Sequence, residues 1–403
     1  MRACLESISN REETQMSQTP RKPSVSRRRF LAQSSLAGAT LALGGRRMTD
    51  AAEPTPLIEG PVAPPHSLVT IAGAARERGH TYGRKFAEPI HAFLETEIYG
   101  RFVTGDNTQD RLLQYAGLCF GHVQSLSSPI AEEMEGLADG ADLRVEEVAL
   151  ITLHEELYHK GIVPLIDHCT ATAVGPPVTS DGNTYVAQSW DWMQSVYGLS
   201  QMLLWKRDDG PSVLSYSYPG LWIGAGLNSA GLALCWTSAQ GGGPGIGVPS
   251  YVLLSHFLYQ PTLEAVEEEA RRAKQAGWFT FVMGDGEGNL LNVEGSPERI
   301  VVERSEGELS RVYFGSHEMT NTPKGDPVPR HPQCQRMMDL VRGKRGEIDL
   351  SALQSFYGDH ESTICKHFGT LDVMVFNCTE REAYVTRGPG CRAEWKTFGF
   401  GET

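Results

Sequence analysis

The chain has 403 residues, of which 40% are hydrophobic and 21% charged, a composition typical of folded enzymes rather than of disordered or collagen-like chains. Its formal net charge of -13 is unevenly distributed, because residues 1–47 carry nine Lys and Arg against three Asp and Glu, a net +6 that leaves -19 for the rest. An acidic body repels phosphate backbones, so no nucleic-acid binding is expected. No run reaches the roughly 18 to 20 apolar residues of a membrane-spanning helix, so no stable membrane insertion is expected either.

The N-terminal segment resembles a twin-arginine export signal. Ser26-Arg27-Arg28-Arg29-Phe30-Leu31 precedes a weakly apolar stretch rich in Ala, Gly, Ser and Leu. Such a signal is an address read by a translocase and not an anchor. We therefore expect residues 1–51 to be a signal peptide, residues 52–67 a linker, and the mature protein to be periplasmic or extracellular. The twin-arginine translocase would be its partner during export; a disordered basic tail is the alternative.

The cysteines argue against a disulfide framework. Cys4 lies in the leader, and the seven that remain are odd in number and include no C-x-x-C pair. At least one free thiol is therefore expected in an exported protein, where most cysteines are paired.

Between Arg78 and Lys160, apolar residues recur at helical spacing and predict about four amphipathic helices. From Cys169 onward, short β-rich runs predict strands. The expected strands are Thr172–Val174, Thr184–Trp190, Met202–Trp205, Val213–Tyr218, Leu221–Gly224, Leu232–Trp236, Phe279–Met283, Leu290–Val293, Ile300–Glu303, Arg311–Phe314, Leu371–Phe376 and Ala383–Thr386. Further helices are expected at Ser250–Leu258, Thr262–Lys274, Gln333–Val341 and Leu350–Phe356. Helices first and layered hairpins after them predict an α+β sandwich of helices on sheets.

One candidate nucleophile stands where the helical part gives way to strands. Asp167-His168-Cys169-Thr170 opens the first strand, and Ser189-Trp190-Asp191-Trp192 closes the next. If the bond between His168 and Cys169 breaks, Cys169 gains a free α-amine with a pKa near 7.7 to 8.0, which can serve as the base for its own thiol. Asp191 on the neighbouring strand would orient the amine or the thiol. Considered alone, a strand cysteine is more often an inert small hydrophobe.

These segments are similar to the D-G-C-T and N-W-D-W motifs of the acyl-coenzyme A:6-aminopenicillanate acyltransferase (penicillin acyltransferase) family. Three further segments resemble the family in the same order: Glu77-Arg78-Gly79 with Gly83, Gly226 to Leu232, and Gly358 to His367. The resemblance implies a cysteine N-terminal-nucleophile (Ntn) hydrolase with a four-layer αββα sandwich. It also implies autocatalytic cleavage between His168 and Cys169, with Cys169 as the nucleophile and Asp191 as its acidic partner. Residues 68–168 would then form a helical α segment and residues 169–403 a β-rich catalytic segment of one domain, associated as two fragments after cleavage.

The chain departs from the family pattern at several positions. His168 replaces a glycine, Ser189 replaces an asparagine, and Gly315-Ser316-His317 aligns with a segment whose asparagine helps to form an oxyanion hole. Anionic intermediates need hydrogen-bond donors, so Thr237, Ser316 and His317 are the residues expected to bind the oxyanion or the substrate, together with Trp190.

The sequence thus predicts an amidohydrolase or acyltransferase that cleaves or transfers the acyl group of a small N-acyl amide or peptide-like substrate through a Cys169 thioester. No cofactor is expected. Asp359, His360, Cys365 and His367 lie close enough in sequence to suggest a metal site, but packing is the commoner role of such residues and no metal is expected. Two alternatives remain open: a disabled Ntn-fold binding protein, and an uncut papain-like enzyme with His317 or His360 as a separate base.

Overall fold

The computed structural model describes residues 63, 65–158, 169–192, 194–239 and 242–401. The expected signal peptide, most of the linker and the bond between His168 and Cys169 lie outside these residues. Within the described part of the chain, no helix is both long enough and apolar enough to cross a membrane.

The helices of the described residues form one group before Cys169 and a second group after it. The first group is α2 (Ala75–Lys85), α3 (Ala87–Phe93), the π-helix η1 (Leu94–Tyr99), α4 (Gly100–Phe102), α5 (Gln109–Leu126), α6 (Ser128–Ala141), α7 (Val145–Thr152) and α8 (His154–Tyr158). The later helices are α9 (Ser250–Leu258), α10 (Leu263–Arg272), α11 (His317–Thr320), α12 (Pro332–Gly343) and α13 (Leu350–Phe356), with short 3-10 turns η2 (Gln194–Val196), η3 (Glu361–Thr363) and η4 (Gly390–Arg392).

The strands form two sheets. An eight-stranded sheet has the order β1-β4-β5-β6-β7-β8-β9-β10, and a six-stranded sheet has the order β11-β2-β3-β12-β13-β14. The strands are β1 (Leu68–Ile71), β2 (Thr170–Val174), β3 (Tyr185–Asp191), β4 (Gln201–Trp205), β5 (Val213–Tyr218), β6 (Leu221–Asn228), β7 (Ala233–Ser238), β8 (Phe279–Gly284), β9 (Asn289–Gly295), β10 (Ile300–Glu306), β11 (Glu308–Arg311), β12 (Thr370–Asn377), β13 (Glu382–Arg387) and β14 (Lys396–Gly399). Neighbouring strands are antiparallel except β1 and β4, which are parallel.

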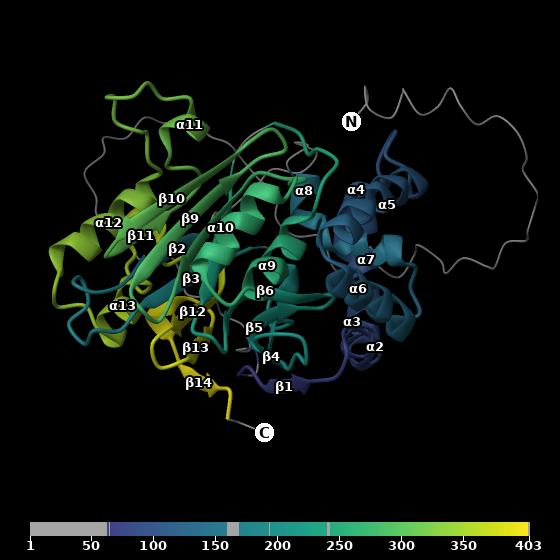
Figure 1. Ribbon diagram of the computed structural model, residues 1–403, viewed down its shortest axis with the longest axis horizontal. Coiled ribbons are helices and arrows are strands. Elements are labelled where there is room, and N and C mark those ends of the chain that lie inside the picture. Colours follow the sequence, from purple (N-terminus) through teal and green to yellow (C-terminus); the bar gives the residue numbers. More distant parts are fainter. Residues whose placement is uncertain (1–62, 64, 159–168, 193, 240–241, 402–403) are drawn as a thin grey trace, which may run out of the picture. The chain divides into compact units, whose positions relative to one another are not determined.

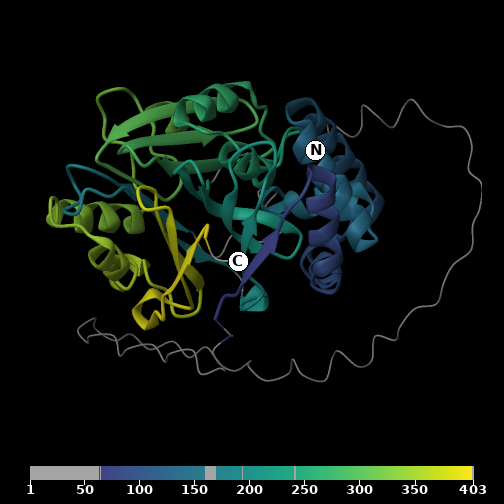
Figure 2. The same cartoon turned by 60° about the horizontal axis from the view of Figure 1, so that its bottom comes forward.

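The two sheets pack face to face and helices cover both outer sides. β2 and β3 of the smaller sheet contact β7 and β8 of the larger one, α9 and α10 cover the larger sheet, and α12 contacts the smaller sheet. In Figure 1 the helices α2–α7 lie on one side of the strands and α12 and α13 on the other, and Figure 2 shows the same separation after a turn of 60°. This is a four-layer αββα sandwich, so the predicted α+β class and layer order are confirmed.

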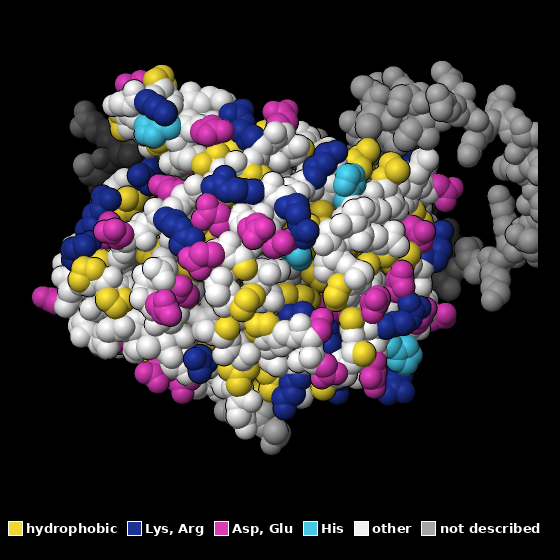
Figure 3. Space-filling view, in the orientation of Figure 1, with side chains coloured by type: hydrophobic (Ala, Val, Ile, Leu, Met, Phe, Trp, Pro, Cys, Tyr) yellow, Lys and Arg dark blue, Asp and Glu magenta, His cyan; other side chains and the backbone are white. Residues whose placement is uncertain are grey.

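Burial on both faces explains the composition of the central strands. Every residue of β2, β3, β5, β6, β7 and β8 is buried, and α9 is buried on all sides because it lies between the larger sheet and the helices α6 and α7. Strands covered on both faces are expected to be rich in apolar residues, and the buried polar residues that interrupt these strands include Gln188, Ser189 and Asp191 of β3. The amphipathic α10, in contrast, buries only Leu263, Val266 and Ala270. The face seen in Figure 3 carries acidic and basic side chains intermixed.

Glycines allow α2 and α6 to pack at very short range. A Cβ atom on Gly79 would lie 2.0 Å from the carbonyl oxygen of Glu133, and one on Gly136 would lie 2.0 Å from that of Arg76. The contact also contains a buried ion pair, in which Arg78 donates to the Glu133 carboxylate at 2.6 and 3.1 Å. Three of the residues whose pattern resembles the acyltransferase family, Arg78, Gly79 and Gly83, are therefore helix-packing residues.

Most predicted elements are present with shifts of one to three residues, and α9, α13 and β5 have the predicted bounds. The hairpin at Asn228–Gly231 is confirmed, since β6 pairs with β7 across it. The strand expected at Arg311–Phe314 was wrong: β11 ends at Arg311, because Tyr313 has a φ of 66°, which interrupts extended backbone. β1 and β14, four residues each, were not predicted.

Gly136→Ala should destabilise the protein by about 1–3 kcal/mol, because the added methyl group meets the backbone of α2 and not a movable side chain. The free energy of unfolding from urea titration measures the effect. Gly121→Ala in α5 is the matched control, since its Cβ would have no neighbour within 4 Å, and it should be neutral or stabilising by up to about 1 kcal/mol. Equal effects of the two substitutions would contradict the close-packing explanation.

Candidate active site

Cys169 lies immediately before β2, whose first residue is Thr170. Its side chain is partly exposed, and its Sγ lies 3.8 Å from the backbone carbonyl oxygen of Asp191. The two residues are brought together because β2 and β3 pair antiparallel, with Thr170 opposite Ser189. The predicted nucleophile and its predicted acidic partner are therefore neighbours.

The Asp191 carboxylate has no exposed surface and is held by three side chains. Thr370 donates its hydroxyl to Oδ1 at 2.7 Å, Ser189 donates to Oδ2 at 3.3 Å, and the ammonium group of Lys366 forms an ion pair with Oδ2. Thr370 lies opposite Asp191 in the pairing of β12 with β3. Its hydroxyl also accepts a hydrogen bond from the Lys366 backbone N–H at 3.1 Å, so the turn before β12 is fastened to the same carboxylate.

Burial governs the charges at this position. It raises the pKa of the Asp191 carboxyl above its ordinary value, and the nearby Lys366 offsets only part of the rise. Burial, together with the Asp191 carboxylate, raises the pKa of the Cys169 thiol to about 12. In the uncut chain the thiol is thus protonated near neutral pH, and the carboxylate beside it is a better proton acceptor than an exposed aspartate.

The first residue of β2 is fixed from both sides of the sheet. The backbone N–H of Thr170 donates to the Ser189 hydroxyl at 3.2 Å, the Tyr357 hydroxyl donates to the Thr170 carbonyl at 3.2 Å, and Gln333 of α12 donates to the Thr170 hydroxyl at 3.1 Å. Ser189, which departs from the family pattern, has a clear structural role here, because its single hydroxyl links Thr170 to Asp191. The backbone next to Cys169 is therefore rigidly positioned.

An aromatic cluster surrounds Trp190 on β3. Its ring centroid lies 5.1 to 6.4 Å from four other rings, those of Tyr216, Tyr218, Trp236 and Tyr251. The indole N–H of Trp190 and the hydroxyl of Tyr251 are buried and have no hydrogen-bond partner among the described residues. The cluster is thus a largely apolar region with two buried polar groups that have no partner among the described residues, and the substrate-binding role of Trp190 stays a prediction.

Helix α8 adds a pair of buried acids beside this cluster. The His154 ring stacks on Tyr251 at 5.1 Å, and burial lowers the pKa of His154 to about 4. Burial raises the pKa of Glu156 to about 7, although its carboxylate accepts a hydrogen bond from the Ser250 N–H at 2.7 Å. Burial also raises the pKa of Glu155 well above its ordinary value, and the neighbouring Glu156 adds to this shift. α8 therefore presents mainly neutral groups at neutral pH.

The other predicted donors lie elsewhere in the described structure. Thr237 is buried in β7, and its hydroxyl donates to the Ser238 carbonyl at 3.2 Å. Ser316 is the N-cap of α11 and donates its hydroxyl to Glu294 at 2.6 Å, and His317 is the first residue of that helix. Among the described residues, no hydrogen bond joins Thr237, Ser316 or His317 to Cys169, and their oxyanion role stays a prediction.

Lys366 and Thr370 were missed as site residues. The signal for Lys366 was available, because it lies in the segment from Gly358 to His367 that resembles the acyltransferase family. Nothing in the sequence placed that segment beside β3, since the contact depends on the pairing of β12 with β3. The same segment brings His360, Cys365 and His367 together with Cys391, while Asp359 instead pairs with Arg336 at 2.6 Å.

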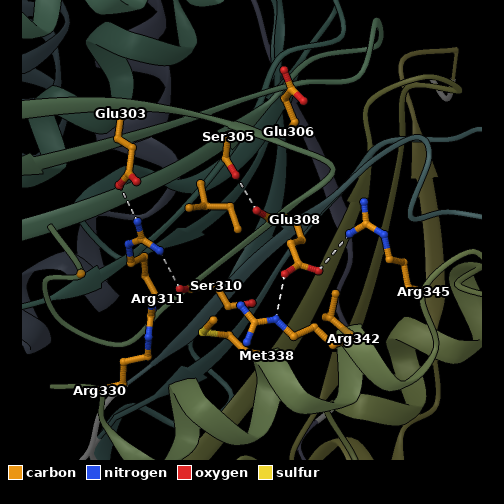
Figure 4. Close-up of a pocket in the computed structure, with 13 residues that line it drawn as sticks. Glu303, Ser305, Glu306, Glu308, Ser310, Arg311, Arg330, Met338, Arg342 and Arg345 are labelled. Carbon is orange, nitrogen blue, oxygen red and sulfur yellow. Dashed lines mark hydrogen bonds and ion pairs between the residues drawn. The ribbon is translucent and has the colours of Figure 1, made fainter. Parts of the chain in front are cut away.

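A separate polar pocket of about 320 Å³ lies between β10, β11 and α12 (Figure 4). Its arginines are largely neutralised: Arg311 pairs with Glu303 at 2.7 Å, and Arg342 and Arg345 both pair with Glu308. The pocket is lined by neither Cys169 nor Asp191. It is therefore not the candidate active site.

The fold and the site together define an αββα sandwich with a cysteine at the start of an inner strand and a buried aspartate beside it. No family model matches the chain, and no curated protein matches it. Among solved structures, the chain is similar to penicillin V acylase from Agrobacterium tumefaciens, with 11% identity, a TM-score of 0.40, and coverage of 58% of this chain and 86% of the other. It is also similar to two variants of conjugated bile acid hydrolase from Clostridium perfringens, with 15% and 14% identity, TM-scores of 0.39 and 0.37, and coverage of 58% of this chain and 98% of each.

Glu156→Gln should stabilise the protein at pH 8 and have little effect near pH 4.5. The folded-state pKa of about 7 lies above the unfolded value, so the stability contributed by protonated Glu156 is complete below pH 4.5 and is lost as the pH rises to about 7. Glutamine mimics the protonated form and keeps the acceptor for Ser250, which gives an expected gain of about 1–3 kcal/mol at pH 8. Melting curves from pH 4.5 to 8, with Glu132→Gln on the exposed side of α6 as the control, measure the difference. A pH-independent difference would refute the burial argument.

Proposed function

We propose that the protein is a self-processing cysteine Ntn hydrolase that cleaves, or transfers the acyl group of, a small N-acyl amide or peptide-like substrate. The observation that carries the proposal is the position of Cys169, which directly precedes an inner strand and lies 3.8 Å from the backbone carbonyl of Asp191, whose buried carboxylate has three fixed partners. A thiol at this position becomes an N-terminal nucleophile if the preceding peptide bond is cut.

The first reaction would be self-cleavage. The Cys169 sulfur attacks the carbonyl carbon of His168, the thiol proton passes to the backbone nitrogen of Cys169, and the C–N bond breaks to give a thioester and a free α-amine. Water then hydrolyses the thioester, which releases the His168 carboxylate and restores the thiol. Asp191 is suited to accept and return the proton because burial raises its pKa.

In the catalytic cycle, the α-amine of Cys169 would take the thiol proton as the sulfur attacks the substrate amide. The same proton then goes to the departing amine, leaving the acyl group on the sulfur as a thioester. Water, or a second amine in a transfer reaction, resolves the thioester. The apolar cluster around Trp190 would receive the acyl group, and its unpartnered indole N–H would offer a hydrogen-bond donor.

The environment of the thiol favours this mechanism over a papain-like one. A papain-like cysteine has a depressed pKa because a histidine cation stabilises its thiolate. Here the thiol pKa is raised to about 12, and the neighbouring charged groups that influence it among the described residues are Asp191, Glu155 and Lys366. The α-amine of Cys169 becomes a free base only after cleavage. This mechanism therefore agrees with a thiol that is protonated and unreactive in the uncut chain.

We also propose export by the twin-arginine pathway to the periplasm or cell exterior, on the motif within residues 1–51. Coenzyme A thioesters are scarce outside the cytoplasm, so hydrolysis is the proposed main reaction, and transfer from an acyl-coenzyme A is secondary. Rapid thioester turnover by the purified protein without amide hydrolysis would make acyl transfer the main reaction and contradict this part of the proposal.

Cys169→Ala should prevent processing, because it removes the only atom proposed to attack the His168 carbonyl. Intact-mass and N-terminal analysis of the purified full chain should find two fragments in the parent, one beginning at Cys169, and a single uncut chain in the variant. Cys119→Ala, a change at another buried cysteine in α5, should still be processed. An uncut but active parent would favour a separate-base enzyme, and an uncut inactive parent would favour a binding protein.

Asp191→Asn should slow self-cleavage by about 10²- to 10⁴-fold, the range typical of a lost general acid–base group. The fraction of cut chain is followed over time on denaturing gels after synthesis. Asp181→Asn is the matched control, since Asp181 lies in the turn before β3 and bonds to Tyr185 rather than to site residues. Cleavage of both variants at the parental rate would remove Asp191 from the mechanism.

A further inference from the structure

Four potential metal-binding side chains, three from one segment and one from η4, meet at one point. His360 precedes η3, Cys365 and His367 lie in the turn before β12, and Cys391 lies in η4. One donor atom of each, two imidazole nitrogens and two sulfurs, lies within 4.8 Å of every other. We propose that these residues bind one Zn²⁺ ion as a Cys2His2 site, and that the ion positions Lys366 against Asp191.

The spacing of the donors is close to that of a tetrahedral zinc site. The Nε2 atoms of His360 and His367 are 3.0 Å apart, and Nε2 of His367 is 3.3 Å from the Cys391 sulfur. Zn–N bonds of about 2.0–2.1 Å and Zn–S bonds of about 2.3 Å place donors roughly 3.3–3.8 Å apart in a tetrahedron. Small outward movements of these side chains would admit the ion, and Cys2His2 is a donor set that zinc prefers.

Hydrogen bonding alone does not account for the arrangement. The single Nε2 atom of His367 faces both the His360 nitrogen and the Cys391 sulfur, yet a ring nitrogen makes one hydrogen bond in the plane of its ring. A metal ion between the donors satisfies all of them at once.

The backbone holds the segments together independently of any ion. The Cys365 N–H donates to the Asp359 carbonyl at 2.9 Å, which closes the loop that carries His360. Gly390 lies so close to this loop that a Cβ atom would be 2.3 Å from the Tyr357 carbonyl oxygen, and a Cβ on Gly358 would be 3.4 Å from Cys391. Glycine at position 390 therefore lets η4 approach closely enough for Cys391 to join the cluster.

The cluster is linked to the candidate active site through one residue. Lys366 lies between two of the proposed ligands, Cys365 and His367, and its ammonium group pairs with the Asp191 carboxylate. Its backbone is bonded to Thr370 in both directions, by the N–H to the Thr370 hydroxyl and by the carbonyl to the Thr370 N–H. A metal that fixes the two flanking residues would hold Lys366 as a positioning residue; this step alone rests on the proposed function.

The test is metal analysis of the full chain, purified after growth with zinc and dialysed without chelator. The parent and Cys169→Ala should each contain close to one zinc per chain, so the result does not depend on self-cleavage. His360→Ala and Cys391→Ser should lose at least 90% of it, whereas His80→Ala, which changes an exposed histidine outside the cluster, should retain it. Substitution with Co²⁺ should give the visible absorption of a tetrahedral thiolate site in the parent and not in the two ligand variants.

Because His360 and Cys391 are exposed, both variants should fold, and circular dichroism checks that they do. Loss of zinc should also slow self-cleavage, which tests the link to Lys366, and Lys366→Met should slow it while keeping the zinc. The metal proposal would be overturned by a parent with less than a tenth of an equivalent of zinc, by unchanged zinc in both ligand variants, or by a disulfide between Cys365 and Cys391 in the freshly purified protein.

Discussion

The need to satisfy a fully buried carboxylate organises the centre of this molecule. Asp191 has no exposed surface, and an ionised carboxylate without partners would be far too costly in such a place. Its partners come from β3 itself, from β12 and from the turn before β12, so the two strands and that turn must meet in a defined register. Loss of a partner would leave a buried carboxylate incompletely compensated, which is why such an arrangement favours a single structure.

A second buried carboxylate performs a comparable role at the edge of the helical layer. Glu133 of α6 accepts hydrogen bonds from Arg78, from the Trp205 indole at 3.0 Å and from the Tyr259 hydroxyl at 2.7 Å. It thereby connects α2 and α6 with β4 and the end of α9. The hairpin residue Asn228 is similar, since its side chain bonds to four backbone groups, including the carbonyls of Leu258 and Gln260. The early and middle segments that resemble the acyltransferase family thus stabilise the frame, and the chemistry that we propose involves Cys169 and the turn before β12.

The sequence was most informative where local pattern decides structure. The bounds expected for α9 and α13 were correct, and short β-rich runs located most strands. It failed for β1 and β14, short strands at an edge of each sheet whose extended form depends on partners elsewhere in the chain. The site shows the same division. Cys169 and Asp191 were predicted because their segments adjoin consecutive strands. Lys366, Thr370 and Cys391 approach this region only through contacts between segments far apart in the chain, which one sequence does not display.

The parallel pairing of β1 with β4 has a consequence for how the molecule is held together. Leu68 stands opposite Met202, so the first described strand is an integral part of a sheet whose other members all follow Cys169. Tyr82 extends the connection by donating its hydroxyl to the Tyr218 carbonyl at 2.6 Å. A break in the backbone before Cys169 would consequently release no removable propeptide. It would produce a permanent two-chain particle, in which neither piece retains a complete core when separated from the other.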